Sequence, residues 1–349
     1  MRARGTGREE NEERVLERIR RAFGGQRLRG DSDGLRSAAG SRFLSLGVGD
    51  DAALVSATPG YDIVLTCDWF LEGTHFLRGR HPADAVGWKC LARAVSDIAA
   101  MGAVPRSFLL SLALPRELAG SWLDEFLGGL RRAAKRFGCS LAGGDTTERR
   151  EVLINVTVVG EVRRGREVRR SGARPGDIIY VSGRLGEAEL GLRLLREGRR
   201  GLSLREARLR KHLYPEPRVE LGRWLSEKGV ATTMMDLSDG LSSDLRRLCA
   251  ASRIGAVINS DHLPTVRVTK PERNRRVDPL QLALHGGDDY ELLFTVPKSK
   301  AKRLPRSVGG VTLTRIGEIT QACEVMVVDG NGRPRLLESR GWDPFRTSK

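Results

Sequence analysis

Apolar residues form two kinds of pattern along this chain, a helical spacing and short continuous runs. In residues 11–23, Val15, Ile19 and Phe23 lie four positions apart, which predicts an amphipathic helix. Similar patterns predict helices over residues 82–101, 118–137, 187–196, 218–228 and 240–251. Short apolar runs predict strands over residues 63–66, 108–114, 140–142, 152–162, 178–182, 291–296, 312–316 and 325–328. Helices and strands that alternate in this way are typical of an α/β fold.

A basic, glycine-containing stretch at residues 163–176 separates two groups of these elements and predicts a domain boundary. The length of 349 residues is in the size range of two domains. Residues 24–42 are rich in glycine, arginine and serine, which predicts a mobile loop. We therefore expect an N-terminal helix and loop over residues 1–42, an N-terminal domain over residues 43–162 and a C-terminal α/β domain over residues 163–349.

The net charge of the chain is strongly positive. A formal charge of +16, from 60 Lys and Arg against 44 Asp and Glu, would attract nucleic acid, and it would equally suit an enzyme that handles phosphorylated small molecules. Stacking aromatic residues are not interleaved with the basic runs, which favours solvated surfaces over a nucleic-acid patch. We therefore expect no nucleic-acid partner.

Cysteine spacing and hydropathy indicate the compartment. The cysteines show no CxxC spacing, so neither a zinc site nor a disulfide framework is indicated, and a reducing compartment is expected. No apolar run is long enough to span a bilayer, and the acidic residues near the N-terminus are not typical of a signal peptide. We expect a cytoplasmic protein with no membrane partner.

The feature that bears most on function is a set of aspartates beside glycine, small or apolar residues. They are Asp50, Asp51, Asp68, Asp97, Asp145, Asp236, Asp239, Asp288 and Asp289. Any one of these motifs is also typical of a tight turn in which aspartate caps a helix. An unpaired carboxylate in an apolar setting is costly, whereas Mg²⁺ prefers oxygen ligands and is commonly shared with substrate phosphates. The whole set therefore favours aspartates that meet around Mg²⁺ and a nucleotide.

Asp97 is a special case because it lies inside the helix predicted over residues 82–101, where no turn or cap is needed. Arg93, one turn earlier, offers it a structural partner instead of a metal. Familiar nucleotide and metalloprotease motifs are missing: the sequence has no GxxxxGK[ST], HRD, DFG or HExxH segment. Any nucleotide site is therefore not a P-loop, and acyl-transfer chemistry has little support because the five histidines form no paired nucleophile and base in the sequence.

In this order, the motifs resemble the thiamine-monophosphate kinase family, within the superfamily of aminoimidazole-ribonucleotide synthetase and selenophosphate synthetase. The resemblance covers nearly the whole chain. Its segments are GVGDDAA (residues 47–53), TCDWFLEGTHF (66–76), GWKCLARAVSDIAAMGA (87–103), AGGDTT (142–147), MDLSDGLSSDL (235–245), HGGDDYELLFTV (285–296) and GWDPF (341–345). Any one segment would be weak, but the ordered set is highly specific.

The resemblance implies a two-domain, PurM-like α/β architecture. The N-terminal domain would bind ATP and Mg²⁺, and its sheet would pair with that of a second subunit to form a homodimer. ATP and thiamine monophosphate would bind in a cleft between the domains, and the γ-phosphoryl group would pass in line to the substrate phosphate to give thiamine diphosphate. We expect no catalytic nucleophile, because phosphoryl transfer depends on alignment and charge neutralisation.

The resemblance also implies roles for particular residues. Several Mg²⁺ ions would be bound by Asp51, Thr66, Cys67, Asp68, Asp97, Asp145, Asp236 and Asp239. ATP would contact Gly144, Asp145, Arg170 and Ser238. Thiamine monophosphate would contact His75, Asp288 and Trp342.

Three positions depart from the family pattern. Cys67 stands where a hydroxyl residue is common, and a thiol is a poor ligand for Mg²⁺, so its backbone carbonyl is the better candidate. Asp288 replaces the usual Glu, and Ala94 replaces the usual Asn. Two alternatives stay open: another enzyme of the superfamily acting on a different small phosphorylated substrate, and a basic nucleic-acid-binding protein that has lost catalysis.

Overall fold

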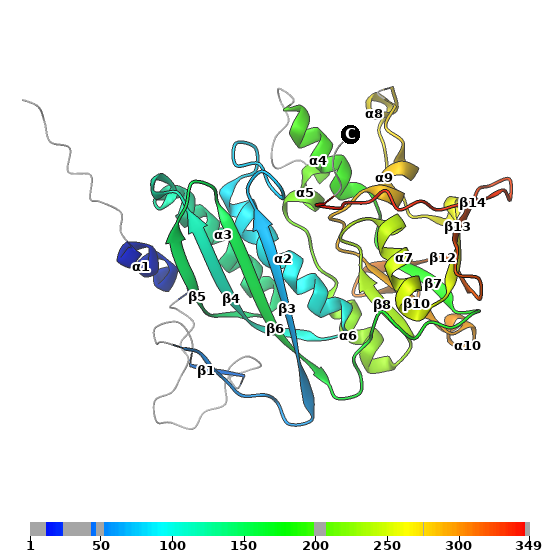
Figure 1. The fold of residues 1–349 in the computed structure, drawn as a ribbon, viewed down its shortest axis with the longest axis horizontal. Coiled ribbons are helices and arrows are strands. Elements are labelled where there is room, and N and C mark those ends of the chain that lie inside the picture. Colours follow the sequence, from blue (N-terminus) through cyan, green and yellow to red (C-terminus); the bar gives the residue numbers. More distant parts are fainter. Residues whose placement is uncertain (1–11, 24–42, 47–51, 199–206, 275, 346–349) are drawn as a thin grey trace, which may run out of the picture. The chain divides into compact units, whose positions relative to one another are not determined.

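The computed structural model describes residues 12–23, 43–46, 52–198, 207–274 and 276–345 (Figure 1). The chain divides into two compact units. The first comprises the residues up to Thr58 together with Cys67–Leu91 and Arg106–Val159. The second comprises Pro59–Thr66, Ala92–Pro105 and Gly160–Lys349. The strands and helices below are described within these units.

A four-stranded sheet with the order β3-β6-β4-β5 carries the first half of the chain (Figure 1). Its strands are β3 (Tyr61–Leu71), β4 (Val104–Leu114), β5 (Ser140–Glu148) and β6 (Leu153–Arg163). The helices and short elements of this half are α1 (Glu12–Phe23), β1 (Leu44–Leu46), β2 (Leu54–Val55), α2 (Ala83–Ala100), η1 (Arg116–Leu118) and α3 (Ser121–Phe137). β4 and β5 are parallel, and Ser111 pairs with Asp145 in their register.

Two glycines let helices α2 and α3 approach each other closely in the first unit. A Cβ at Gly87 would lie 2.0 Å from the Phe126 carbonyl oxygen, and a Cβ at Gly129 would lie 1.8 Å from that of Asp84. Any side chain at these two positions would therefore separate the helices. The close approach fixes the first half of α2.

The second unit is built on a larger sheet with the order β14-β13-β9-β12-β7-β10-β8, and β11 pairs with β12. The strands are β7 (Ile178–Ser182), β8 (Thr233–Asp236), β9 (Gly255–Asn259), β10 (Leu292–Val296), β11 (Ser307–Val308), β12 (Val311–Thr320), β13 (Val325–Val328) and β14 (Pro334–Leu336). The helices are α4 (Glu187–Glu197), α5 (Ala207–Leu213), α6 (Val219–Lys228), α7 (Leu241–Ser252), η2 (Ser260–His262), α8 (Lys270–Asn274), α9 (Pro279–His285) and α10 (Lys298–Ala301).

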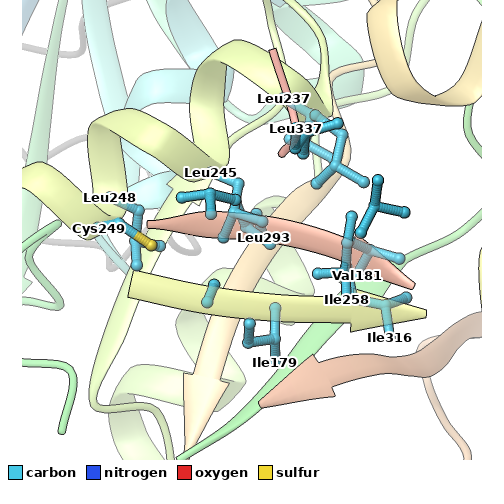
Figure 2. Close-up of a cluster of buried hydrophobic side chains, with 14 of the residues drawn as sticks. Ile179, Val181, Leu237, Leu245, Leu248, Cys249, Ile258, Leu293, Ile316 and Leu337 are labelled. Atoms are coloured by element: carbon cyan, nitrogen blue, oxygen red, sulfur yellow. The ribbon is translucent and has the colours of Figure 1, made fainter. Parts of the chain in front are cut away.

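Both faces of this sheet are buried. Figure 2 shows the larger hydrophobic cluster, in which Val181 of β7 and Leu293 of β10 pack with Leu245 of α7. The neighbouring residues of the same strands, Tyr180 and Phe294, stack on each other in a second cluster with a centroid separation of 5.6 Å. Because successive strand side chains point to opposite faces, this alternation shows that the sheet is covered on both sides.

The second half of α2 packs on α6 within the second unit. A Cβ at Gly222 would lie 2.1 Å from the Ala99 carbonyl oxygen, and a Cβ at Gly102 would lie 2.5 Å from the Ser226 Cβ. The Met101 carbonyl also accepts a 3.1 Å hydrogen bond from the Val168 N–H. These contacts hold the last turns of α2, which carry Asp97.

The predicted elements occur, with two corrections that concern aspartates. The strand predicted over residues 63–66 continues to Leu71, so Asp68 lies within β3 and not after it. The strand predicted over residues 140–142 continues to Glu148, so Asp145 lies in a strand and not in a glycine-rich turn. Pairing of β5 along β4 outweighs the low strand propensity of its two glycines.

Three findings concern expectations about the whole chain. The loop predicted over residues 24–42 lies outside the described residues. All five cysteines have free thiols, and three of them are buried. None of the helices in the described ranges is long and apolar enough to cross a membrane.

Candidate active site

Asp97 is held by a hydrogen bond from the neighbouring strand β3. It lies on α2 between the buried residues Ser96 and Ile98, and its Oδ2 accepts a 2.5 Å hydrogen bond from the Thr66 hydroxyl. Burial raises the pKa of the Asp97 carboxyl group, against the opposing effects of that hydrogen bond and of the Arg170 and Arg93 charges. The hydrogen bond and the arginine charges therefore do not fully offset the cost of desolvating the charged carboxylate, and a bound cation would stabilise it.

Asp97 and Thr66 line a pocket of about 400 Å³ in the second unit. The same pocket is lined by Arg170, whose guanidinium is well suited to bind phosphate oxygens. Much of the remaining wall is apolar: Val64, Leu65, Ala100, Met101, Met234, Met235 and Ala251. The pocket therefore combines an apolar surface, an anion and a cation, which is the set of groups that a nucleotide with its metal requires.

Asp236 ends strand β8 and is almost completely buried, with 3% of its surface exposed. Its Oδ2 accepts a 2.8 Å hydrogen bond from the Ser96 hydroxyl of α2, which is itself buried. Two consecutive residues of α2 thus hydrogen-bond to predicted metal ligands on other elements: Ser96 donates to Asp236, and Asp97 accepts from Thr66.

The segment after β8, residues 236–240, is held by backbone hydrogen bonds to two other segments. The Ser238 carbonyl accepts from the Asp288 N–H at 2.8 Å, and the Asp239 carbonyl accepts from the Trp342 N–H at 2.9 Å. A Cβ at Gly341 would lie 2.1 Å from the Asp239 carbonyl oxygen, so only glycine permits this approach. The structure therefore brings together Asp236, Ser238, Asp239, Asp288 and Trp342.

Asp288 has a positive φ of 65° and several polar neighbours. Its Oδ1 accepts a 2.7 Å hydrogen bond from the Tyr290 hydroxyl and lies 3.8 Å from an Arg93 guanidinium nitrogen. Its Oδ2 lies 3.8 Å from the Nδ1 of the buried His212. Arg93, which the sequence suggested as a partner of Asp97, thus forms an ion pair with Asp288. Sequence reasoning did not identify Tyr290 or His212.

The carboxylate of Asp239 is paired with a basic residue of α7. One guanidinium nitrogen of Arg247, Nη1, donates to Asp239 Oδ2 and, at 2.7 Å, to Asp244 Oδ1. Asp244 is buried and also accepts a 3.1 Å hydrogen bond from the Asp239 N–H. Burial and then the charge of Asp239 raise the pKa of Asp244 to about 7. No sequence motif indicated Arg247.

Two further acids of the 285–291 segment have structural roles. The Asp289 carboxylate accepts hydrogen bonds from the N–H groups of Gly186 at 2.6 Å and Ala188 at 3.2 Å, and so caps the N-terminus of α4. The fully buried Glu291 accepts from the Ser182 hydroxyl at 2.5 Å and forms ion pairs with Lys211 and Arg218. These bonds anchor the segment that carries Asp288.

Five predicted site residues that the structure describes belong to the first unit. Cys67 is exposed, and its Sγ lies 3.2 Å from the Asn155 side-chain oxygen. The His75 Nδ1 accepts a 3.0 Å hydrogen bond from the Leu71 N–H. Asp68 lies within β3, and Gly144 and Asp145 lie side by side within β5. A Cβ at Gly144 would lie 1.9 Å from the Leu110 carbonyl oxygen of β4. Asp51 lies outside the described residues.

The chemistry of the donors fits Mg²⁺. Aspartate carboxylates and a threonine hydroxyl are hard oxygen ligands, and Asp97 is a partly buried carboxylate whose charged form is disfavoured by desolvation. Within the part of the chain that the structure describes, no group of three His, Cys, Asp or Glu side chains is arranged to hold a metal. Mg²⁺ commonly takes only one or two carboxylates, with waters and substrate phosphates as its remaining ligands.

Comparison with known proteins defines the class. The model for "AIR synthase related protein, N-terminal domain" matches residues 49–162, and that for the C-terminal domain matches residues 174–330. The fold and site thus define a two-domain protein of the AIR synthase related class, with the α/β PurM-like architecture. Thiamine-monophosphate kinase from Escherichia coli strain K12 is 38% identical over 311 residues, covering 87% of this chain and 93% of that protein. The chain therefore belongs to the thiamine-monophosphate kinase family.

Solved structures agree with this assignment. The crystal structure of thiamine-monophosphate kinase from Stenotrophomonas maltophilia K279a aligns with a TM-score of 0.74 at 35% identity, covering 90% of this chain and 95% of that one. A structure described as AaThiL complexed with AMPPCP and TMP aligns with a TM-score of 0.74 at 35% identity, covering 85% of this chain and 92% of that one.

Proposed function

We propose that this protein transfers the γ-phosphoryl group of ATP to thiamine monophosphate, forming thiamine diphosphate in a Mg²⁺-dependent reaction. One observation of the structure carries the proposal: the pocket in which the Asp97 carboxylate, bound by Thr66, shares its walls with Arg170. A carboxylate that burial destabilises and a guanidinium in one pocket are suited to a metal and a polyphosphate, respectively. Membership of the family supports the choice of substrates.

Within this proposal, Thr66, Asp97, Asp236 and Asp239 are metal-binding residues of the second unit. Asp51, the backbone of Cys67, Asp68 and Asp145 complete the set. Bound Mg²⁺ supplies neutralisation of the charge on the transferring phosphoryl group. Arg170, Gly144, Asp145 and Ser238 bind ATP, and the protein provides alignment for a direct in-line transfer without a covalent intermediate.

Asp288, Trp342 and His75 bind thiamine monophosphate in this proposal. Trp342 is 43% exposed, so it is accessible to the cationic thiazolium ring, which favours an aromatic face. Asp288 adds a negative charge whose position is fixed by the Tyr290 hydroxyl and by its own N–H bond to Ser238. An aromatic face and a carboxylate together favour a cationic ligand.

The first experiment is conversion of thiamine monophosphate with ATP and MgCl₂, with the two thiamine species separated by chromatography and EDTA as the control. Diphosphate that forms with MgCl₂ and not with EDTA is the expected result. If no diphosphate forms while the protein still binds ATP with MgCl₂, the substrate assignment is wrong, and another phosphorylated acceptor becomes the candidate.

Asp97→Asn tests the metal assignment, because it removes the charge and keeps the volume. We expect kcat to fall at least about a hundredfold, as is usual when a group that stabilises transition-state charge is lost. Asp278→Asn is the matched control. Asp278 is exposed to solvent, and its carboxylate caps α9 by accepting from the Leu280 and Gln281 N–H groups. Equal activities of the Asp97 and Asp278 variants would refute the assignment.

A further inference from the structure

Arg247 of α7 forms an unusual contact for a residue beside a proposed metal site. Its Nη1 nitrogen donates to the carboxylates of both Asp239 and Asp244. Asp239 is one of the proposed Mg²⁺ ligands, so a permanent positive charge lies against a carboxylate that the metal would use. The guanidinium and the metal ion therefore both draw on the single negative charge of this carboxylate.

The two carboxylates differ in how firmly they are held. The Asp244 side chain is completely buried, and its Oδ2 accepts the Asp239 N–H at 3.1 Å while its Oδ1 accepts Arg247 at 2.7 Å. The Asp239 side chain is 23% exposed and the Arg247 side chain is 46% exposed. Asp244 is therefore a fixed anchor for Arg247, whereas the Asp239 carboxylate can exchange partners.

We propose that Arg247 is a positioning residue that neutralises Asp239 when no metal is bound and that competes with the divalent cation for this carboxylate. Arg247 keeps its bond to Asp244 in both states, so only the contact to Asp239 is exchanged. This competition raises the Mg²⁺ concentration at which the site fills. The inference rests on the proposed function, because it takes Asp239 to be a metal ligand.

Two consequences follow for a variant without the guanidinium. In EDTA, Asp239 and the buried Asp244 both lose the guanidinium that compensates them, so the protein becomes less stable. With MgCl₂, the cation no longer competes with Arg247, so it binds at lower concentration. If Arg247 had a purely structural role, its loss would lower the stability in EDTA without lowering the MgCl₂ concentration at which the site fills.

The test is thermal unfolding of the full chain with AMPPCP over a series of MgCl₂ concentrations from an EDTA baseline. For Arg247→Gln we expect a lower midpoint temperature in EDTA. We also expect that the MgCl₂ concentration giving half of the total rise in midpoint temperature is about threefold lower than for wild type, which is the size typical of a partly exposed ion pair. Arg246→Gln is the control, because it removes the same charge from the preceding position of α7, where the side chain donates to the Leu337 carbonyl at 3.2 Å.

The outcomes separate the two proposals. If the wild-type midpoint rises with MgCl₂ and the Arg247→Gln curve has the same half-point as wild type, the competition is refuted and the metal site stands. If both arginine variants lower the half-point equally, the effect is one of net charge and the inference is also refuted. If the wild-type midpoint does not respond to MgCl₂, the metal part of the proposed function fails and this inference fails with it.

Discussion

Glu291 allows a quantitative prediction, because it is a fully buried carboxylate with two cationic partners. It contacts Lys211 of α5 and Arg218 at the start of α6, and the Ser182 hydroxyl completes its hydrogen bonds. Burial alone would raise its pKa, but the charges and hydrogen bonds of the two cations lower the pKa to about 2 from the ordinary 4.5. A lowered pKa means that the charged form stabilises the folded state.

The pKa shift gives the size of the effect. A change from 4.5 to about 2 is roughly 2.5 units. At about 1.4 kcal/mol per unit, this corresponds to about 3 kcal/mol of unfolding free energy at neutral pH. Loss of one partner of a buried ion pair typically costs a similar amount, about 3–5 kcal/mol, because the other charges stay buried without compensation. We therefore expect Glu291→Gln to lower the unfolding free energy by about 3 kcal/mol at pH 7.

The pH dependence checks the reasoning separately. Because the pKa is lowered in the folded state, the stabilisation by Glu291 is complete above pH 4.5 and is lost as the pH falls towards 2. The difference between wild type and Glu291→Gln should therefore be constant from pH 7 to pH 5. At pH 3.5 it should be smaller by about 1 kcal/mol.

Urea unfolding followed by far-UV circular dichroism measures these differences, and hydrogen exchange of peptides from β7 and β10 assigns them to the second unit. Glu318→Gln is the matched control. Glu318 lies on β12 in the same sheet, is half exposed, and is 3.7 Å from Arg315, so its loss should cost less than about 0.5 kcal/mol. A Glu291→Gln effect below about 1 kcal/mol at pH 7, or one that does not shrink at pH 3.5, would refute the account.

Three further changes address other contacts. Gly341→Ala should raise the KM for thiamine monophosphate about tenfold in steady-state assays, because the added Cβ would clash with the Asp239 carbonyl oxygen. Gly79→Ala should leave the KM unchanged, because a Cβ there has no atom within 4 Å. Asp289→Ala should lower the unfolding free energy in urea by about 1–2 kcal/mol, because it removes the cap of α4. Asp145→Asn should abolish turnover and leave the circular dichroism spectrum unchanged; full activity would exclude Asp145 as a metal ligand.

Much of the fold could be predicted from the sequence because long periodic patterns are local. Strands β7 and β13 have the predicted bounds, and helices α1, α2, α4 and α6 differ from the predictions by a residue or two at their ends. Strand β8, Thr233–Asp236, was not predicted. All four of its residues are buried, so it shows no alternation of apolar and polar residues, and its two methionines are not typical of strands.

The candidate site could be predicted only in part, because its residues were recognised by motif and their partners lie far away in the sequence. Ser96 and Asp236 are separated by 140 positions, and Thr66 and Asp97 by 31. Residues so far apart in the sequence come into contact only when the chain folds, so no local pattern predicts which of them will pair. Arg93, which the sequence offered as an alternative structural partner of Asp97, forms an ion pair with Asp288, about 195 positions away.

The segment of residues 285–291 shows the limit most clearly. Asp288, Asp289 and Glu291 are acids within four positions, and nothing in their local sequence distinguishes their roles. In the structure, Asp289 faces the N-terminus of α4, and Glu291 faces the cations of α5 and α6. Those two acids anchor the backbone on both sides of Tyr290 and beside Asp288, which the same backbone then holds at a positive φ. The position of Asp288, the carboxylate proposed to bind the substrate, thus depends on two buried acids with structural partners of their own, so its geometry follows from the packing of α4, α5 and α6.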